Sequence, residues 1–481
     1  MTSQIATSDV DVAVAAAVGA EAEVATAPVE QRALWLEAVA DALEQQAAQI
    51  VPAAEQETRI PAARLHGELS RTSNQLRMFA TVIRDGSYLE AMVDRADPSA
   101  DGAPRPDVRR LLVPLGPVAV FSASNFPFAF SVAGGDTASA LAAGCPVVVK
   151  AHPGHPRLSN ITAEVARAAL AGSGAPDGTI GLVHGLEAGR ALVTAPAVRA
   201  VGFTGSLTGG RALFDLATNR PDPIPFYGEL GSLNPVYVTA KAVAERGDDI
   251  ATGFVASYTL GAGQLCTKPG IVFVPAGGGI AERAAELVGE VCLGPLLNSD
   301  LESSFRHAVA RLRAVEGVHA VAGSTDDSVG VPVLLRTDVA HLLEHRTELL
   351  NEAFGPASLI VEYKTPEELA EAAAAIPGSL TASLFADGDE PELPALLTVV
   401  QRQAGRLIWN GWPTGVAVTW AMHHGGPFPA TTSPLHTSVG ATAIGRWLRP
   451  VAFQNWPQQL LPAPLKDGAP GPVRVDGALP S

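Results

Sequence analysis

The 481-residue sequence predicts an α/β fold with two doubly wound lobes. Short apolar strands alternate with segments of helical spacing in the first half of the chain, and the same alternation returns in the second half. This order is typical of parallel sheets covered by helices. The length also exceeds the roughly 100–200 residues of one domain, so we expect at least two lobes.

The chain is expected to begin with helices, followed by a polar arm. A short helical segment opens it, and apolar residues recur at helical spacing over residues 29–57 and 62–84. Residues 88–107 are polar and contain glycine and proline, which predicts an exposed arm or linker.

Each lobe is expected to contain four short apolar strands. In the first lobe they lie at residues 118–122, 147–150, 179–184 and 200–203, with helices at 134–143 and 159–171. In the second lobe they lie at residues 271–274, 359–363, 381–385 and 406–410. The tail from Trp447 onward is rich in proline and glutamine, and we expect it to dock on another surface.

The composition excludes several classes of protein. Apolar residues make up 47% of the chain, too many for a disordered protein. The net charge of −16 argues against nucleic acid or an anionic membrane as the main partner. No uninterrupted apolar stretch reaches the roughly 18 residues of a spanning helix.

The cysteines and the first residues favour a cytoplasmic protein. Cys145, Cys266 and Cys292 cannot form a disulfide framework, and their odd number leaves a free thiol, which fits a reducing compartment. No basic residue precedes Arg32, so the charged start of a targeting peptide is missing.

Cys266 is the candidate nucleophile among the three cysteines. A cysteine after an apolar, glycine-rich stretch is more often a small buried residue. A catalytic thiol needs a turn or helix start that supports the thiolate, and Gly261 and Gly263 allow such a turn. Cys145 adjoins a strand, and Cys292 comes closely after an acidic residue, so both are weaker candidates.

Glu229 and Asn125 are candidate partners of that thiol. Glu229 stands among apolar and glycine residues, and is either a solvated turn residue or a buried base with a raised pKa. Asn125 comes after a strand, where it is either a turn residue or a donor to an oxyanion. Phe126, Phe128 and Phe130 would supply an apolar wall, although such aromatics are usually core residues.

Two further patterns suggest ligand sites. Gly205 and Ser206 lie between a strand and a helix start, which is either an anion site or a plain turn. No complete G-x-G-x-x-G occurs, so a dinucleotide would need a variant Rossmann arrangement. His341 and His345 form an H-x-x-E-H pattern that resembles a zinc peptidase motif. No third ligand motif accompanies them, so we expect a solvated helix face and no metal.

Six short motifs occur along the chain in an order that is typical of one protein family. They begin at Asn125 (Asn-Phe-Pro), Lys150, Phe203 (Phe-Thr-Gly-Ser), Glu229 (Glu-Leu-Gly), Gly263 (Gly-Gln-Leu-Cys) and Asn351 (Asn-Glu-Ala-Phe-Gly-Pro). Their order and spacing resemble the aldehyde dehydrogenase superfamily over nearly the whole chain. The resemblance implies a cofactor-binding domain in residues 1–95 and 117–229, a catalytic domain in 230–443, and an oligomerisation arm and tail in 96–116 and 444–481.

Variants of these motifs indicate a branch. The stretches beginning at Lys150 (Lys-Ala-His-Pro-Gly-His-Pro), Cys266 (Cys-Thr-Lys-Pro-Gly) and His424 (His-Gly-Gly-Pro-Phe-Pro-Ala-Thr) resemble 2-oxoglutarate semialdehyde (2,5-dioxopentanoate) dehydrogenases. The same branch resembles NADP-linked fatty aldehyde dehydrogenases, so a medium- or long-chain fatty aldehyde is the alternative substrate. Ser124 and Ser232-Leu233 depart from the commoner Trp and Gly-Lys, which puts the shape of the pocket in doubt.

The resemblance also implies the catalytic roles. The Cys266 thiolate attacks the aldehyde, the Asn125 amide and the Cys266 backbone N–H hold the oxyanion, and Glu229 activates water to hydrolyse the thioester.

It implies a cofactor site as well. Lys150 and His152 lie at the adenosine end, Gly205 and Ser206 meet the pyrophosphate, Glu352 holds the nicotinamide ribose and Phe354 packs beside its ring. No acidic residue comes after Lys150 at positions 151–153, which removes repulsion against a 2′-phosphate and favours NADP over NAD.

The same helix that contains Arg71 offers candidate substrate residues. Arg71, Asn74 and Gln75 share one face of this helix, and that face borders either the aldehyde tunnel or solvent. If it borders the tunnel, Arg71 and Gln75 contact the substrate together with Phe128.

Members of the family usually form homodimers or homotetramers. Two rival functions remain: a non-catalytic binding protein on the same scaffold, and a zinc peptidase. The binding protein is disfavoured because a nucleophile, a base and an oxyanion donor are all present.

Overall fold

The first lobe is built on a five-stranded parallel sheet. The computed structural model describes residues 2–99, 102–323 and 330–478. The strand order is β5-β4-β3-β6-β7. The strands are β3 (Val118–Phe121), β4 (Val147–Lys150), β5 (Ile180–Val183), β6 (Ala200–Thr204) and β7 (Phe226–Glu229). The order reverses beside β3, and ligands bind at the carboxyl ends of strands at such a reversal.

Helices cover both faces of this sheet because successive strand residues point to opposite sides. Val118, Val120 and Val149 pack with one set of helices, and Ala119 and Val148 pack with the other. The first set is α2 (Val29–Gln45), α3 (Ala47–Thr58), α4 (Ala62–Asp85), α5 (Gly135–Ala143) and α6 (Pro156–Gly172). The second set is α1 (Thr2–Thr26), α7 (Leu186–Thr194) and α8 (Leu207–Thr218).

The second lobe has a seven-stranded sheet in the order β10-β11-β12-β9-β8-β13-β14, antiparallel only between β10 and β11. Its strands are β8 (Val236–Val238), β9 (Ile271–Pro275), β10 (His319–Ala322), β11 (Val333–Asp338), β12 (Ala357–Tyr363), β13 (Ser379–Phe385) and β14 (Ala404–Trp409). Its helices are α9 (Ala240–Thr259), α10 (Ile280–Val288), α11 (Ser299–Arg313), α12 (Val339–Glu344), α13 (Arg346–Leu349), α14 (Pro366–Ala375) and α15 (Leu393–Val400). The predicted α/β class with two lobes is therefore confirmed.

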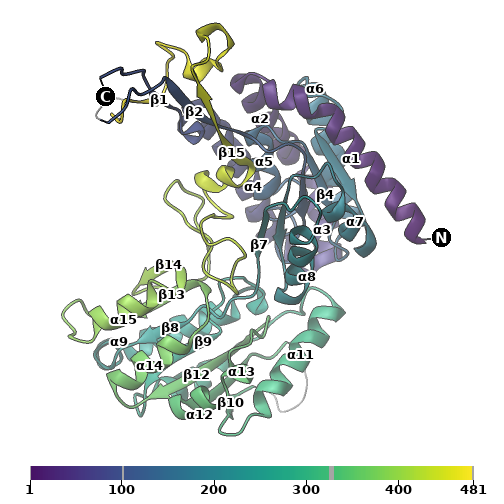
Figure 1. Cartoon of the computed structure of the whole chain (residues 1–481). Helices are drawn as coiled ribbons and strands as arrows, with labels where there is room; N and C mark the ends of the chain where they lie inside the picture. The colour runs from purple at the N-terminus through teal and green to yellow at the C-terminus, as the bar shows by residue number, and fades with distance from the viewer. Residues whose placement is uncertain (1, 100–101, 324–329, 479–481) are drawn as a thin grey trace.

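A third, smaller sheet joins the arm to the tail. It contains β1 (Met92–Asp94), β2 (Val108–Pro114), β15 (Leu448–Gln454) and β16 (Arg474–Val475), in the order β15-β2-β1-β16. Figure 1 shows this sheet extending from the first lobe, away from the second. The arm was expected to be an exposed linker and the tail to dock on another surface, and no strand was predicted in either. Two of the four strands are only two or three residues long, too short to produce a recognisable alternation.

Other differences from the expected elements are small. Residues 29–57 form two helices that meet at Gln46 instead of one, and the opening helix α1 is 25 residues long instead of short. Within the described residues, no helix has the length and apolar character needed to cross a membrane.

Candidate active site

The carboxyl ends of the first sheet bring several predicted residues to one edge. Asn125 lies in the loop after β3, Lys150 ends β4, Gly205 and Ser206 come directly after β6, and Glu229 ends β7. Because all these strands are parallel, their ends meet at the side that faces the second lobe (Figure 1).

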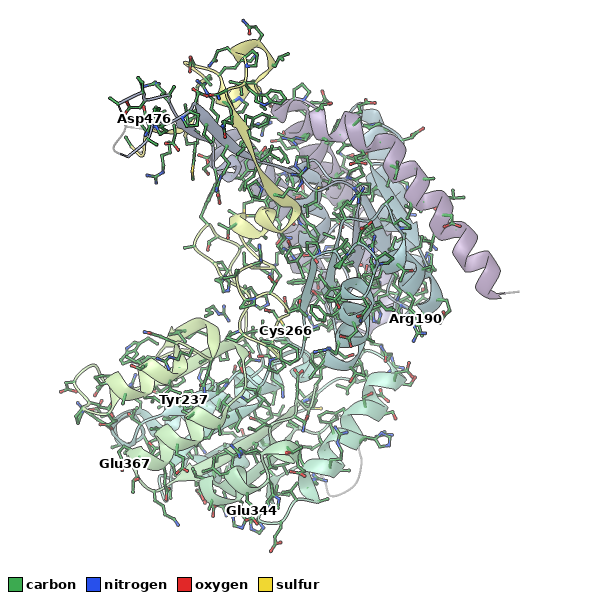
Figure 2. The ribbon with its side chains drawn as sticks, viewed as in Figure 1. Arg190, Tyr237, Cys266, Glu344, Glu367 and Asp476 are labelled. Atoms are coloured by element: carbon green, nitrogen blue, oxygen red, sulfur yellow. The ribbon has the colours of Figure 1, made fainter. Side chains whose placement is uncertain are left out.

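Cys266 belongs to the second lobe and lies where the two lobes meet (Figure 2). It comes after helix α9 and a tight turn in which Gly261, Ala262 and Gly263 all have positive φ, between 55° and 65°. A Cβ on Gly263 would stand 2.2 Å from the carbonyl oxygen of Gly355. Only glycine fits there, so the turn brings the Cys266 segment against the segment that carries Glu352 and Phe354.

Asn234 fixes the backbone around the thiol. Its Nδ2 donates to the carbonyl oxygens of Cys266 (2.8 Å) and Lys268 (2.9 Å), and its own φ is +51°. Ser232 donates its hydroxyl to Asn234 Oδ1 at 2.8 Å and accepts the backbone N–H of Leu380 at 2.9 Å. Ser232, which departs from the commoner motif, therefore gives buried support to the turn that carries Cys266.

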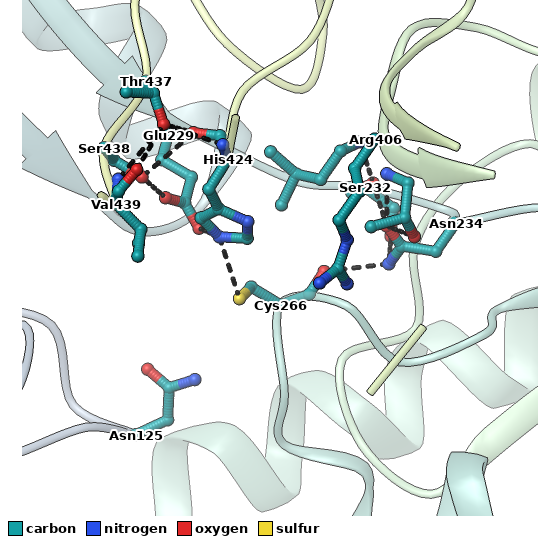
Figure 3. Close-up of polar contacts among 12 residues, drawn as sticks. Asn125, Glu229, Ser232, Asn234, Cys266, Arg406, His424, Thr437, Ser438 and Val439 are labelled. Atoms are coloured by element: carbon teal, nitrogen blue, oxygen red, sulfur yellow. Dashed lines mark hydrogen bonds and ion pairs between the residues drawn. The ribbon is translucent and has the colours of Figure 1, made fainter. Parts of the chain in front are cut away.

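An imidazole joins the thiol to the carboxylate. His424 Nε2 lies 3.6 Å from Cys266 Sγ and 3.0 Å from Glu229 Oε1. Ser438 donates its hydroxyl to the other carboxylate oxygen, Glu229 Oε2, at 2.6 Å. Figure 3 shows the three side chains converging from three parts of the chain: Glu229 from β7, Cys266 from the turn after α9, and His424 from the irregular segment after β14.

Burial and charge set the protonation of this group. Burial raises the pKa of the Cys266 thiol well above its usual value, and the neighbouring Glu229 charge raises it further. Burial also raises the pKa of the Glu229 carboxyl, but the charge and hydrogen bond of His424, with hydrogen bonds from Ser438 and Cys266, lower it more. Glu229 was expected to be either a solvated turn residue or a buried base with a raised pKa. It is instead buried with a lowered pKa.

Asn125 and the Cys266 backbone lie in position to hold an oxyanion. Asn125 Nδ2 donates one hydrogen bond to the carbonyl oxygen of Gln264 at 3.0 Å, which leaves its second N–H available. Among the described residues, the backbone N–H of Cys266 has no acceptor. Arg64 donates to the carbonyl oxygen of Asn125 at 2.9 Å and so holds its loop.

The predicted pyrophosphate residues, Gly205 and Ser206, lie at the start of α8. Ser206 caps this helix by accepting the N–H of Gly209 at 3.2 Å, and residues 205–208 are exposed, so the first free N–H groups of the helix face solvent. A cavity of about 430 Å³ lies between α7 and α8, and its two charged lining residues, Arg190 and Glu187, pair with each other at 3.7 Å.

Lys150 fits the same site. Its side chain packs against α7 beside Gly189, and burial lowers its pKa. It has no acidic partner within the described part of the chain. His152, for which burial lowers the pKa to about 3, stacks on His155 at a centroid distance of 5.5 Å. A cation without an acidic partner and free helix N–H groups suit a nucleotide with a diphosphate.

Glu352 and Phe354 lie on the other side of the catalytic turn. Glu352 Oε2 comes within 2.9 Å of the point where a Cβ on Gly231 would stand, beside the loop that comes after Glu229. Burial raises the pKa of Glu352 to about 7, and burial lowers that of the neighbouring Lys268 to about 8. Lys268 donates to the carbonyl oxygens of Ala353 (3.1 Å) and Ala357 (2.6 Å), which ties the two predicted cofactor residues to the catalytic turn.

Of the three predicted substrate residues, Arg71 is partly buried, whereas Gln75 and Phe128 are buried. Arg71 lies over the rings of Phe126 and Phe130, with its guanidinium carbon 5.9 Å from each centroid. Gln75 is buried and packs against the start of α5 at Gly135, and Phe128 is buried in the core of the first lobe.

The histidine pair of the peptidase-like pattern lies far along the second lobe. His341 belongs to the short helix α12, where Asp338 accepts from its backbone N–H and contacts its ring, both at 2.9 Å. His345 stands between α12 and α13. Among the described residues, the three metal-type ligands that do cluster, within 4.8 Å, are Glu229, Cys266 and His424.

His424 and Ser438 were not assigned a role from the sequence. His424 lay within a motif used to indicate the branch, but its contact with Glu229 joins residues 195 positions apart, and no spacing rule connects them.

Comparisons with known proteins agree with this geometry. The model of the aldehyde dehydrogenase family matches residues 2–428. Alpha-ketoglutaric semialdehyde dehydrogenase 2 of Azospirillum brasilense is 48% identical over 453 residues, covering 92% of this chain and 86% of that protein. Alpha-ketoglutaric semialdehyde dehydrogenase of Acinetobacter baylyi is 42% identical over 475 residues, covering 97% and 90%.

Solved structures show the same fold. A 3,6-anhydro-L-galactose dehydrogenase has a TM-score of 0.78 at 21% identity, covering 93% of this chain and 92% of that one. Aldehyde dehydrogenase C of Pseudomonas syringae, in complex with NAD⁺ and octanal, has a TM-score of 0.77 at 21% identity, covering 93% and 89%. The chain belongs to the aldehyde dehydrogenase family and is an NAD(P)-dependent aldehyde dehydrogenase.

Proposed function

We propose that this enzyme oxidises 2-oxoglutarate semialdehyde to 2-oxoglutarate, with Cys266 as nucleophile, Glu229 as base and Asn125 as oxyanion donor. The observation that carries the catalytic assignment is the contact of His424 Nε2 with both Cys266 Sγ and Glu229 Oε1. The substrate assignment rests on the names of the two relatives that match nearly the whole chain.

The first chemical step is attack on the aldehyde carbon. The raised pKa of Cys266 keeps it a thiol at rest, so attack requires an acceptor for its proton. Glu229 takes that proton, because its lowered pKa keeps it ionised. The new carbon–sulfur bond forms as the carbonyl oxygen becomes an oxyanion, which the Asn125 amide and the Cys266 N–H stabilise, each such donor typically contributing about 3–4 kcal/mol.

The second step releases the acid. NAD(P)⁺, when bound, supplies the acceptor for the hydride that leaves the substrate carbon. Glu229 first releases to solvent the proton that it took from the thiol. It then accepts a proton from the water that attacks the thioester on Cys266, and it returns this proton to the sulfur as the carbon–sulfur bond breaks. His424 holds the carboxylate in place throughout by donating to Oε1.

Turnover with a panel of aldehydes tests the proposal. Wild-type enzyme is expected to prefer 2-oxoglutarate semialdehyde to hexanal and octanal, whereas a preference for the fatty aldehydes would favour the alternative substrate class. Cys266→Ala should abolish cofactor reduction, and Cys292→Ala, at an exposed cysteine, should leave it unchanged. Substantial turnover by Cys266→Ala would end the catalytic assignment.

We further propose that NADP is preferred over NAD. Positions 151–153 carry no acidic residue after Lys150. The lack of a carboxylate there suits the extra negative charge of a 2′-phosphate. A kcat/KM ratio that favours NAD would overturn this assignment.

The remaining proposals concern organisation. We propose that residues 1–95 and 117–229 bind the cofactor, residues 230–443 form the catalytic domain, and residues 96–116 with 444–481 join subunits into a homodimer or homotetramer. The projecting third sheet and the exposed side chains of Trp456 and Leu460 support the last point, which light scattering tests directly. Three free cysteines support a cytoplasmic location.

A further inference from the structure

Helix α4 places two charged side chains against the loop that carries Asn125. Arg64 and Glu68 stand four residues apart, so they share one face of this helix. Glu68 is only 5% exposed, and a carboxylate is seldom buried so deeply unless its oxygens have specific partners. The contacts of both side chains lead to the same loop.

Glu68 holds the far end of the loop through two backbone groups. The N–H groups of Phe128 and Ala129 donate to its Oε1 at 2.8 and 3.0 Å. Within the part of the chain that the structure describes, its other oxygen, Oε2, has no hydrogen-bond partner. Burial raises the pKa of the Glu68 carboxyl more than these two hydrogen bonds and the charges of Arg64 and Arg71 lower it. Both hydrogen bonds of this buried carboxylate therefore go to the loop.

Arg64 holds the near end of the same loop. Its Nη2 donates to the carbonyl oxygen of Asn125 at 2.9 Å, and its guanidinium carbon lies 5.3 Å from the centroid of the Phe126 ring. Its Nη1 comes within 3.1 Å of the point where a Cβ on Gly261 would stand, in the turn that precedes Cys266. Arg64 therefore lies between the loop of Asn125 and the turn that carries the nucleophile.

The position of this loop decides where the Asn125 amide points. Asn125 Nδ2 donates to the carbonyl oxygen of Gln264, two residues before Cys266, and Figure 3 shows the Asn125 side chain extending toward Cys266. A group that stabilises a developing charge has to be held within about 0.5 Å of its productive position, and a shift of about 1 Å can cost about 100-fold in rate. Because Asn125 belongs to a loop, contacts from a neighbouring helix have to supply that precision.

We propose that Arg64 and Glu68 are positioning residues for the oxyanion donor: together they hold the backbone of residues 125–129 so that the Asn125 amide faces the substrate carbonyl at Cys266. This inference rests on the proposed role of Asn125 and adds two residues that act through it. Their loss should slow the step in which the oxyanion forms and leave the binding of the aldehyde nearly unchanged.

Arg64→Met tests the inference, because Arg64 is only partly buried and its replacement should leave the fold intact. For an aldehyde that the wild-type enzyme oxidises, we expect kcat to fall about 10- to 100-fold while KM changes less than about threefold. The rate of Cys266 alkylation by iodoacetamide, a reaction that forms no oxyanion, should stay as in wild type. Arg77→Met is the matched control, since Arg77 lies on the same helix but pairs with Asp41 and Glu44.

A double-substitution cycle separates positioning from general support of the fold. If Arg64 acts through Asn125, adding Arg64→Met to Asn125→Ala should lower kcat by less than about threefold further. Losses that multiply in the double variant would overturn the inference, and so would an unchanged kcat in Arg64→Met. Wild-type turnover by Asn125→Ala would instead overturn the proposed role of Asn125 itself.

Two substitutions of Glu68 test the other contact. Glu68→Ala removes the acceptor of both N–H groups and should lower kcat as Arg64→Met does. The side-chain oxygen in Glu68→Gln still accepts both N–H groups, so this variant should keep kcat within about threefold of wild type. A kcat loss in Glu68→Gln as large as that in Arg64→Met would contradict the role assigned to this oxygen, and the comparison holds even if Glu68→Ala fails to fold.

Discussion

At the scale of single residues, the catalytic thiol is poised but not ionised. Cysteine nucleophiles in many enzymes have a lowered pKa, whereas burial and Glu229 raise that of Cys266. In the proposed mechanism, the same carboxylate that opposes the thiolate accepts its proton. A thiol that stays protonated is expected to oxidise slowly in the absence of an aldehyde.

Removing the Glu229 charge should make the thiol more acidic. We expect Glu229→Gln to shift the pH dependence of Cys266 alkylation to lower pH, because the like charge that disfavours the thiolate is gone. The rate of iodoacetamide labelling between about pH 6 and 10 measures this shift. Glu344→Gln, at a glutamate of the second lobe far from the thiol, should behave as wild type. A shift to higher pH would show that Glu229 does not act on the thiol as described.

Removing the His424 imidazole should instead affect the carboxylate. His424 lowers the pKa of Glu229, so in His424→Asn burial prevails and the pKa of Glu229 rises. The acid limb of the kcat/KM profile, where Glu229 becomes protonated, should move up by roughly one pH unit. His423→Asn is the control, since His423 makes no hydrogen bond with Glu229. An acid limb that stays in place would remove His424 from the mechanism.

The sequence alone pointed to the candidate residues that stand in short, recognisable motifs. Cys266, Glu229 and Asn125 stand in short motifs with a recognisable context, and their assigned roles stay predictions until variants are measured. The contact of His424 with Glu229, by contrast, depends on how an irregular segment crosses between two sheets. No periodicity of apolar residues encodes such a path.

At the scale of elements, the cofactor edge depends on the loops at the carboxyl ends of the strands. The loop after β4 contains no acid beside Lys150, and Pro153 in this loop is exposed. The start of α8 supplies N–H groups one strand away from the reversal of the sheet. If the cofactor binds at this edge as proposed, discrimination between NADP and NAD should depend on the loop after β4.

A single negative charge in that loop should invert the preference. Pro153→Glu is expected to raise KM for NADP about tenfold relative to NAD, because a carboxylate near the 2′-phosphate costs roughly 1.4 kcal/mol in repulsion. Steady-state kinetics with both cofactors measure the ratio. Pro153→Gln has the same shape without the charge and should keep the wild-type preference. Identical ratios for the two variants would place the 2′-phosphate elsewhere.

Long elements were predicted better than short ones. The helix expected at 62–84 spans Ala62–Asp85, and the strand expected at 147–150 has those bounds. Strands β7 and β8, with four and three residues, gave no clear pattern, although β7 ends at Glu229. A strand of three residues shows one alternation at most, which cannot be told from a loop.

At the scale of the whole molecule, buried contacts at Trp447 and Arg446 attach the tail to the first lobe. Trp447 is fully buried, and its Nε1 donates to Ser139 at 2.8 Å. Its carbonyl oxygen accepts the N–H of Leu115 at 2.9 Å, and the neighbouring Arg446 pairs with Asp136 at 2.6 Å. The third sheet, assembled from segments more than 300 residues apart in sequence, thus begins from a fixed anchor.

Truncating this anchor should destabilise the whole first lobe. Trp447→Ala is expected to lower the free energy of unfolding by about 3–5 kcal/mol, the usual cost of removing a large buried aromatic. Thermal and chemical denaturation measure the loss, and Trp456→Ala, at a tryptophan that is 48% exposed, should cost far less. Equal effects of the two substitutions would mean that the tail contributes stability without a specific anchor.

The thiol, the imidazole and the carboxylate are carried by three separate parts of the chain that meet between the lobes. The distances between these three side chains therefore depend on the contact between the two lobes, each of which has its own sheet and core. We expect that mild heat or a low concentration of urea that weakens this contact would interrupt proton transfer while circular dichroism still records intact helices and strands. Loss of turnover should consequently precede loss of secondary structure.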